Sequence, residues 1–183
     1  MPISSPPSGA SLERSVAGPV TLSELSLVLL ALVRIFVGLL WFQQLAWKMP
    51  PTFQGLRKYV ESEAQHTFVP GYGFILKNVF LAHFILLGAS VWTAELLVGV
   101  LLLFGLFTRL GAVLALLLSI QLYVGLAYAP GEWYWTYGML VLLSLTFVAV
   151  PAGRRLGLDQ LLAPKLTRHA QRHRFARLLL WFV

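Results

Sequence analysis

The 183-residue sequence contains no cysteine, and only 11% of its residues are charged. The absence of cysteine excludes disulfides, thiolate nucleophiles, cysteine-ligated iron–sulfur clusters and cysteine zinc sites within the chain. Soluble domains carry about 25% charged residues, more than twice the share found here. The sequence therefore lacks the charge that a water-facing surface of this size requires, and it is not that of an ordinary soluble protein.

Apolar residues make up 58% of the chain and are grouped in long runs. A helix of about 20 apolar residues crosses the ~30 Å hydrocarbon core of a bilayer, and four stretches are candidates: 25–46, 79–106, 110–128 and 134–150. The fold class predicted is an all-α integral membrane protein, a four-transmembrane-helix bundle with a long outward loop between the first two helices. The stretch 79–106 exceeds one span, so it is either tilted or begins as an interfacial helix.

These spans divide the sequence into three parts. Residues 1–21 are rich in Ser, Pro and Gly and are expected to form a flexible N-terminal tail. Residues 22–152 form the four-helix membrane domain, and a short amphipathic helix is expected near 53–64 in its long loop. Residues 153–183 are expected to form a basic amphipathic cytoplasmic tail, lying on an anionic leaflet or against a partner subunit.

The net charge of +7 predicts orientation in the membrane. The predicted cytoplasmic side carries Arg14, Arg109, Arg154, Arg155, Lys165, Arg168, Arg172, Arg174 and Arg177, and the other side carries Lys48, Arg57, Lys58 and Lys77. We therefore expect a multi-pass protein of the cell (inner) membrane with both termini cytoplasmic. Because the basic residues flank hydrophobic spans, the bilayer is the expected partner, and no nucleic acid is expected.

Arg34 and Glu95 are ionisable residues inside predicted spans. Counted at 1.5 Å per residue, each lies about 14–17 Å from the cytoplasmic end of its helix. A charge at that depth costs at least about 2.5 kcal/mol, so it normally faces the bundle interior and has a partner. We predict that the two side chains pair with each other. The pair serves either as a structural ion pair that sets helix register or as part of a proton relay or quinone site.

A second group of candidate residues gathers at the predicted outer surface. A quinone carbonyl needs a His, Tyr or Lys donor beside an apolar channel, and this surface offers His83, His66, Lys48, Trp135 and Tyr137. The alternatives are structural: the aromatic residues form an interfacial belt, Lys48 is a snorkelling anchor and His83 caps a helix. The two histidines lack the i, i+4 spacing of a metal site, and no metal, haem or flavin is predicted.

A set of spaced motifs resembles the DoxX/DoxD family of small membrane proteins. Its strongest part is the block from Glu95 to Arg109, which reads E-x-x-x-G, a run of leucines, then G-L-x-T-R. The remaining motif residues are Arg34, Gly38, Trp41, Trp47, Lys48, Trp133, Trp135, Tyr137, Met139, Gly153, Arg154, Leu158 and Asp159. Their order and spacing cover about 33–162, most of the expected folded chain.

The resemblance implies a four-helix membrane bundle and a redox role. DoxD proteins form the small membrane subunit of a thiosulfate:quinone oxidoreductase, which passes electrons from thiosulfate to quinone together with a DoxA partner. On this interpretation Glu95 and Arg34 are the catalytic candidates, quinone is the expected cofactor, and a DoxA-like or other redox subunit is the expected partner. A homo-oligomer is a further expectation. The alternative is a non-catalytic membrane scaffold or assembly protein of DoxX type.

Overall fold

A computed structural model describes residues 23–170 and 174–183, and its regular structure within these ranges is helical. The predicted N-terminal tail, 1–21, lies outside the described residues. The elements in chain order are α1 (Glu24–Leu45), the 3-10 turn η1 (Ala46–Lys48), α2 (Gln54–His66), α3 (Tyr72–Ile75), the π-helical turn η2 (Leu76–Phe80), α4 (Phe84–Phe104), α5 (Thr108–Leu126), α6 (Tyr134–Ala149), the 3-10 turn η3 (Ala152–Arg154), α7 (Asp159–Ala170) and α8 (Arg174–Phe182).

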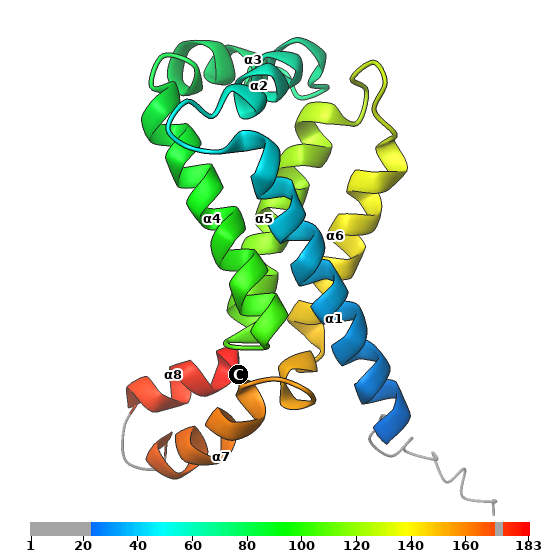
Figure 1. Cartoon of the computed structure of the whole chain (residues 1–183), viewed down its shortest axis with the longest axis vertical. Helices are drawn as coiled ribbons and strands as arrows, with labels where there is room; N and C mark the ends of the chain where they lie inside the picture. The colour runs from blue at the N-terminus through cyan, green and yellow to red at the C-terminus, as the bar shows by residue number, and fades with distance from the viewer. Residues whose placement is uncertain (1–22, 171–173) are drawn as a thin grey trace, which may run out of the picture.

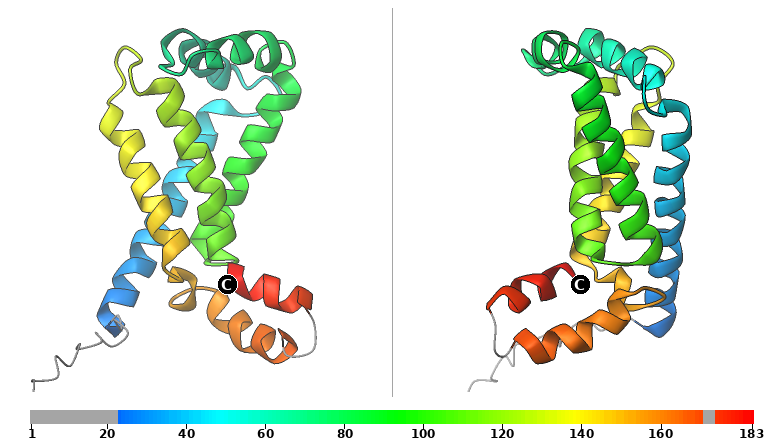
Figure 2. Two further views of the ribbon diagram at one scale, coloured as in Figure 1. Left: turned by 180° about the vertical axis from the view of Figure 1, so that it is seen from behind. Right: turned by 60° about the vertical axis from the view of Figure 1, so that its left-hand side comes forward.

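The long helices α1, α4, α5 and α6 run along the long axis of the molecule (Figure 1). The helices α2 and α3 lie across one end, and α7 and α8 lie across the other, as the views in Figure 2 also show. We call these the α2 end and the α7 end. Three described helical segments are long and apolar enough to cross a membrane: Glu24–Lys48, Phe84–Phe104 and Thr108–Leu126. The apolar helix α6 is shorter, at 16 residues.

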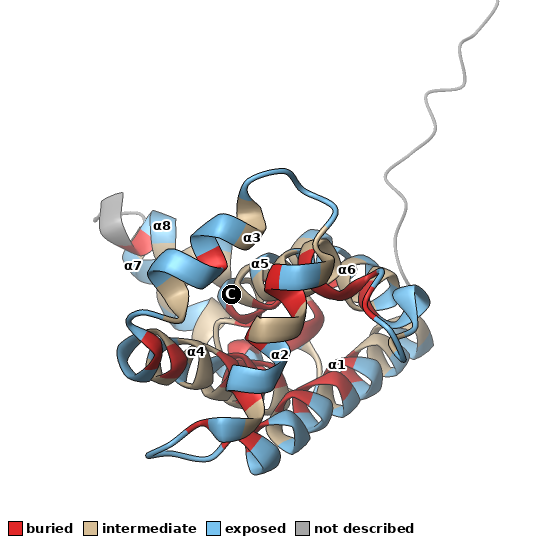
Figure 3. Ribbon diagram, turned by 90° about the horizontal axis from the view of Figure 1, so that it is seen from above, coloured by how far each residue is buried: buried red, intermediate tan, exposed pale blue. Residues whose placement is uncertain are grey.

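The outer faces of the long helices are apolar. Figure 3 shows exposed positions on the outside of the bundle and buried positions on the sides that face neighbouring helices. The exposed large side chains include Leu29, Phe36, Leu86, Leu97, Leu117, Ile120, Leu142 and Leu145. Contiguous apolar surface of this kind is disfavoured in water and is the normal contact surface for lipid tails. The prediction of an all-helical fold is confirmed, and three of the four predicted spans are helices that can cross a membrane by length and composition.

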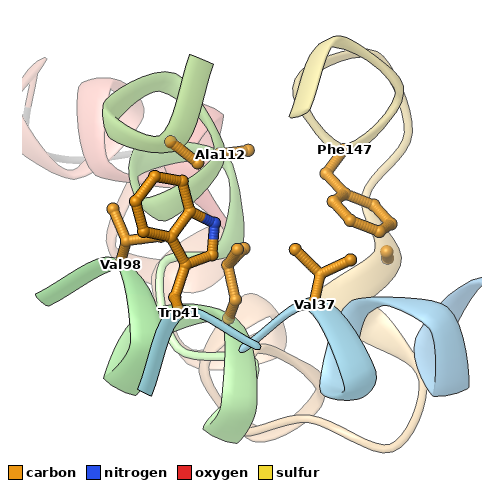
Figure 4. Packing of buried hydrophobic residues seen from close by; sticks show 8 residues of the cluster. Val37, Trp41, Val98, Ala112 and Phe147 are labelled. Atoms are coloured by element: carbon orange, nitrogen blue, oxygen red, sulfur yellow. The ribbon is translucent and has the colours of Figure 1, made fainter. Parts of the chain in front are cut away.

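Side chains from all the long helices meet in the middle of the bundle. Val37 and Trp41 from α1 pack with Val98 from α4, Ala112 from α5 and Phe147 from α6 (Figure 4). These five side chains are at most 3% exposed. Ala112 is the small residue among them, and small residues allow the helices that carry them to approach closely in a membrane.

The contact between α1 and α4 depends on Gly38. A Cβ atom added at Gly38 would lie 2.9 Å from the backbone Cα of Leu103 on α4. Real Cβ atoms do not approach backbone so closely, so any side chain at this position would push the two helices apart.

A second apolar core lies between α2 and the bundle. Leu56, Val60 and Ala64 of α2 are buried together with Leu76 and Phe84. The helix α2 therefore covers this end of the bundle with its apolar face rather than projecting from it.

The apolar stretch predicted as 79–106 is broken near its start. The chain leaves η2 at Phe80, and α4 begins at Phe84 after a turn. A non-helical backbone at His83, with φ −113° and ψ 35°, separates the two elements. Of the two sequence-based alternatives for this stretch, the structure favours a separate short element before the long helix.

Candidate functional site

The predicted pair between Arg34 and Glu95 is wrong. Arg34 donates hydrogen bonds to the backbone carbonyls of Ala152, at 3.2 Å, and Leu156, at 2.7 Å. Glu95 instead pairs with Lys48, whose Nζ lies 2.5 Å from Oε1. The depth argument failed because it counted each residue from its own helix end, whereas α1 extends past the turn between α4 and α5 (Figure 1). Arg34 consequently lies beside that turn.

Asp159 lies at the α7 end of the bundle, as Arg34 does, and bonds to the turn between α4 and α5. Its carboxylate accepts hydrogen bonds from the backbone N–H groups of Phe107, at 2.7 Å, and Thr108, at 2.9 Å. These groups are at the start of α5, where helical N–H groups lack intrahelical partners and an acid is favoured. The Asp159 N–H in turn donates to the Gly105 carbonyl at 2.8 Å. One buried acid thus joins the α4–α5 turn to the start of α7.

Glycines make room for these side chains. Gly105 adopts a left-handed backbone, with φ +60°, and a Cβ there would lie 2.6 Å from the Arg34 Cζ atom. A Cβ at Gly153 would lie 2.9 Å from the Asp159 carboxyl carbon. The structure therefore brings separate sequence motifs into one network, the α7-end network, which comprises Arg34, Gly105, Thr108, Gly153 and Asp159.

The other end of the bundle contains a buried ion pair. The Lys48 and Glu95 side chains are 5% and 4% exposed. Lys48 ends η1, and Glu95 lies in the middle of α4. The second carboxylate oxygen of Glu95, Oε2, is buried and has no hydrogen-bond partner among the described residues. The desolvation cost of a buried ion pair is offset only when all its polar atoms are bonded. Oε2 of Glu95 is therefore open to a further hydrogen-bond partner or a proton.

Glu63 is a second buried acid close to this pair. It is 2% exposed. The Gln121 Nε2 atom lies 2.5 Å from its Oε2 and 3.2 Å from the Tyr72 hydroxyl oxygen. Lys48 lies within electrostatic range, but burial dominates and raises the pKa of Glu63 to about 8. We call Lys48, Glu63, Tyr72, Glu95 and Gln121 the α2-end network.

Gly125 allows Glu63 to reach α5. A Cβ at Gly125 would lie 2.7 Å from the Glu63 Cγ atom. The sequence analysis did not select Glu63, although a signal was present. Leu56, Val60 and Ala64 recur at helical spacing on the apolar face of α2, and Glu63 falls on that face. An acid on the buried side of an amphipathic helix needs an explanation that an acid on its polar side does not.

The five predicted quinone-binding residues do not form one site. Lys48 bonds Glu95, and the Tyr137 hydroxyl donates to Glu132 at 2.6 Å. The two histidines bond locally: Nδ1 of His66 lies 2.9 Å from the Ser62 carbonyl, and Nδ1 of His83 lies 3.0 Å from the Val79 carbonyl. His83 lines a small surface hollow beside Arg57. Trp135 is 58% exposed.

Trp135 lines a separate groove on α6. The groove encloses about 420 Å³ and is bounded on one side by Tyr123 of α5. Its other lining residues are Tyr134, Trp135, Gly138, Met139, Val141 and Leu142. This volume is within the range of small-molecule sites, and an apolar aromatic lining suits a flat, lipid-soluble ring. Of the five predicted residues, only Trp135 contributes to it.

Comparison with known proteins identifies the family. The sequence model of the family described as "TQO small subunit DoxD" matches residues 59–180. The searches of curated proteins and of solved structures each returned no significant match. The matched region includes every residue of the two networks except Arg34 and Lys48. Since the match covers more than half of the chain, the protein belongs to the DoxD family.

Proposed function

We propose that the chain is the quinone-interacting membrane subunit of a thiosulfate:quinone oxidoreductase-type complex. The family match supports membership of such a complex. The chain has no cysteine, and thiosulfate oxidation therefore falls to a DoxA-like or other redox partner. The observation that carries the proposal is the buried Lys48–Glu95 pair, which leaves one carboxylate oxygen of Glu95 unbonded among the described residues.

The α2-end network has the groups that quinone reduction requires from a protein. A quinone takes up two electrons and two protons when it is reduced. Lys48 holds one oxygen of Glu95 and leaves the other to accept or donate a proton. Glu63 and Gln121 extend the network toward α3, where the Tyr72 hydroxyl meets the same amide. Positioned groups that exchange protons with a substrate are the usual protein contribution to such a step.

The groove beside Trp135 is the proposed place for the quinone ring. It lies on helices whose outer faces are apolar, so a lipid-soluble molecule reaches it laterally from the bilayer. The groove and the α2-end network share the helix α5, which carries Gln121 of the network and Tyr123 of the groove. The histidines His66 and His83 remain candidate donors at the α2 end.

The proposed placement in the membrane has α6 as the fourth span. Its 16 residues correspond to about 24 Å at 1.5 Å per residue, and the aromatic side chains at its start fit the interface with water. The α7 end carries the basic residues Arg109, Arg154, Arg155, Lys165, Arg168 and Arg177. In the cell (inner) membrane the α7 end therefore faces the cytoplasm, and the basic helices α7 and α8 lie along the anionic leaflet.

The experiment that tests the proposal is a quinone-reduction assay. Membranes containing the chain, with and without a DoxA-like partner, are compared with empty membranes for thiosulfate-dependent reduction of a soluble quinone. We expect activity only with the partner and its loss in Glu95→Gln. Glu61→Gln is the matched control, because Glu61 is an exposed acid in a surface pair with Arg57. Full turnover in Glu95→Gln membranes would refute the role of Glu95.

A non-catalytic scaffold is the second candidate. It is favoured by the α7-end network, in which motif residues bond to backbone groups and leave no free side-chain acid. On this interpretation the Lys48–Glu95 pair sets helix register only. The two functions separate in the same assay, since a scaffold shows no activity with any partner while still inserting into the membrane.

A further inference from the structure

We propose that Glu63 is a proton-binding site of this protein. At neutral pH the α2-end network holds one proton on the Glu63 carboxyl group and exchanges it with water at the α2 end of the bundle. The use of this proton in quinone reduction rests on the proposed function, whereas the presence of the proton does not.

The burial of Glu63 favours the neutral acid, and no cation in contact among the described residues offsets it. Its side chain is 2% exposed, and its hydrogen-bond donor is the neutral amide of Gln121 at 2.5 Å. Within the described part of the chain, no Lys, Arg or His nitrogen lies within ion-pair distance of its carboxylate. A buried carboxylate without a cation in contact pays a large desolvation cost, and protonation removes that cost.

The charge balance of the network leads to the same result. Lys48 brings one positive charge, and its Nζ bonds Glu95 at 2.5 Å. With Glu95 ionised, that charge is already balanced. A second ionised acid at Glu63 would give the buried group a net negative charge, so the neutral total requires one proton on Glu63.

The elements packed around Glu63 do not supply a second cation. The polar groups that face it are Lys48 from η1, Tyr72 from α3, Gln121 from α5 and Tyr137 from α6. Glu95 of α4 reaches the group through Lys48. The element η2 contributes the apolar Leu76 beneath α2.

Burial raises the pKa of Glu63 to about 8, although the Gln121 hydrogen bond and the charge of Lys48 both lower it. The acid therefore changes its charge close to physiological pH, as a group that takes up and releases protons must.

The Glu63 carboxyl is placed for exchange with water. Its helix α2 lies across the end of the bundle and not within it (Figure 1). The Gln121 amide links the carboxyl to the Tyr72 hydroxyl, and Tyr72 is partly exposed on α3. This arrangement predicts a proton that titrates reversibly in the isolated chain.

The test is an infrared titration of the purified full-length chain in nanodiscs, without a partner or quinone. A protonated carboxylic acid has a carbonyl stretching band that its carboxylate lacks. We expect this band at neutral pH and its loss with a midpoint near the pKa of Glu63, about 8. Glu63→Gln should remove the titrating band, and Glu61→Gln should keep it because Glu61 is an exposed acid of the same helix.

Two further variants make the result unambiguous. Glu63→Asp keeps an acid at the position and should shift the midpoint of the titration. This shift tests the inference even if Glu63→Gln does not fold. In Glu95→Gln, Lys48 loses its paired acid, so the midpoint of the band should move to lower pH. Absence of a titrating band in the wild type, its persistence in Glu63→Gln, or a midpoint that rises in Glu95→Gln would overturn the inference.

The infrared result and the quinone assay fail independently. If the wild-type chain has the titrating band but reduces no quinone with its partner, the proton site is supported and the proposed function is refuted. If the complex turns over but Glu63 gives no titrating band, the proton site alone is refuted. When both hold, Glu63→Gln should lower turnover and remove the decline in rate with a midpoint near pH 8.

Discussion

The two ends of the bundle use buried charge in different ways. At the α7 end, Arg34 and Asp159 bond to backbone groups of the turns that join the helices. At the α2 end, the acids Glu63 and Glu95 lie near one cation, Lys48, and bond to side chains. Backbone partners are fixed by the fold, whereas side-chain partners can be exchanged or titrated. We therefore infer that the first network holds helices together, and we propose the second as the place of proton exchange.

The largest expected effect is at the ion pair of the α2 end. Lys48→Leu or Glu95→Leu alone leaves a buried charge without a partner, and we expect a loss of about 3–5 kcal/mol in the free energy of unfolding. The double variant removes both charges and should be more stable than either single variant. Unfolding of purified variants in nanodiscs measures this. Equal destabilisation by the double and single variants would contradict the account.

At the α7 end we expect a loss that no second substitution rescues. Arg34→Leu leaves the carbonyls of Ala152 and Leu156 without their charged donor, at about 1–2 kcal/mol each. Adding Asp159→Leu should make the protein less stable still, because Asp159 bonds to N–H groups at the start of α5 that Arg34 does not contact. The same unfolding measurements test this prediction. Recovery of stability in the Arg34→Leu, Asp159→Leu double variant would contradict the difference between the two ends.

Glu63 should make stability depend on pH. Its pKa is raised in the folded protein to about 8, so the folded state binds more protons than the unfolded state between the unfolded value of about 4.3 and 8. Stability should therefore fall as pH rises through this window, by at most about 1.4 kcal/mol per pH unit.

Unfolding of the chain at several pH values measures this slope. Glu63→Gln should reduce the slope, and Glu61→Gln should leave it unchanged. Stability that rises over the same range in the wild type, with no change in Glu63→Gln, would contradict the assignment.

The smallest effect is expected at the surface of α2. Arg57 and Glu61 form an i, i+4 pair at 3.6 Å, and their side chains are 49% and 46% exposed. Replacing Glu61 by alanine should change stability by about 0.5 kcal/mol or less, since exposed pairs are screened by water. A change several times larger would mean that α2 contributes to stability through its outer face as well as its buried one.

The sequence predicted the helical membrane fold because long apolar runs leave few alternatives. It also selected Arg34 and Glu95, since charges in apolar helices stand out, and it selected Lys48 as a quinone donor or anchor at the outer surface. The pair it predicted, Arg34 with Glu95, was wrong. Helix depth can be counted along one helix, but the offset between helices depends on how the turns fold, and α1 extends past its neighbours (Figure 1).

Other parts of the site depend on contacts that spacing alone does not reveal. Asp159 appears in the sequence as a motif residue, yet its role at the start of α5 depends on the fold of the segment after α6. Glu63 was hidden for a different reason. The loop that carries it is polar, and its buried position follows only when α2 is seen to cover the bundle with that face.

Turnover per folded molecule in Glu95→Gln tests the central claim most directly. The complex of the chain with its redox partner is assayed for thiosulfate-dependent quinone reduction, and the amount of folded protein is measured in the same preparation. The account predicts a folded Glu95→Gln protein with activity lost, while Glu61→Gln retains wild-type turnover. Full turnover per folded molecule in Glu95→Gln would contradict it and leave the Lys48–Glu95 pair a structural one.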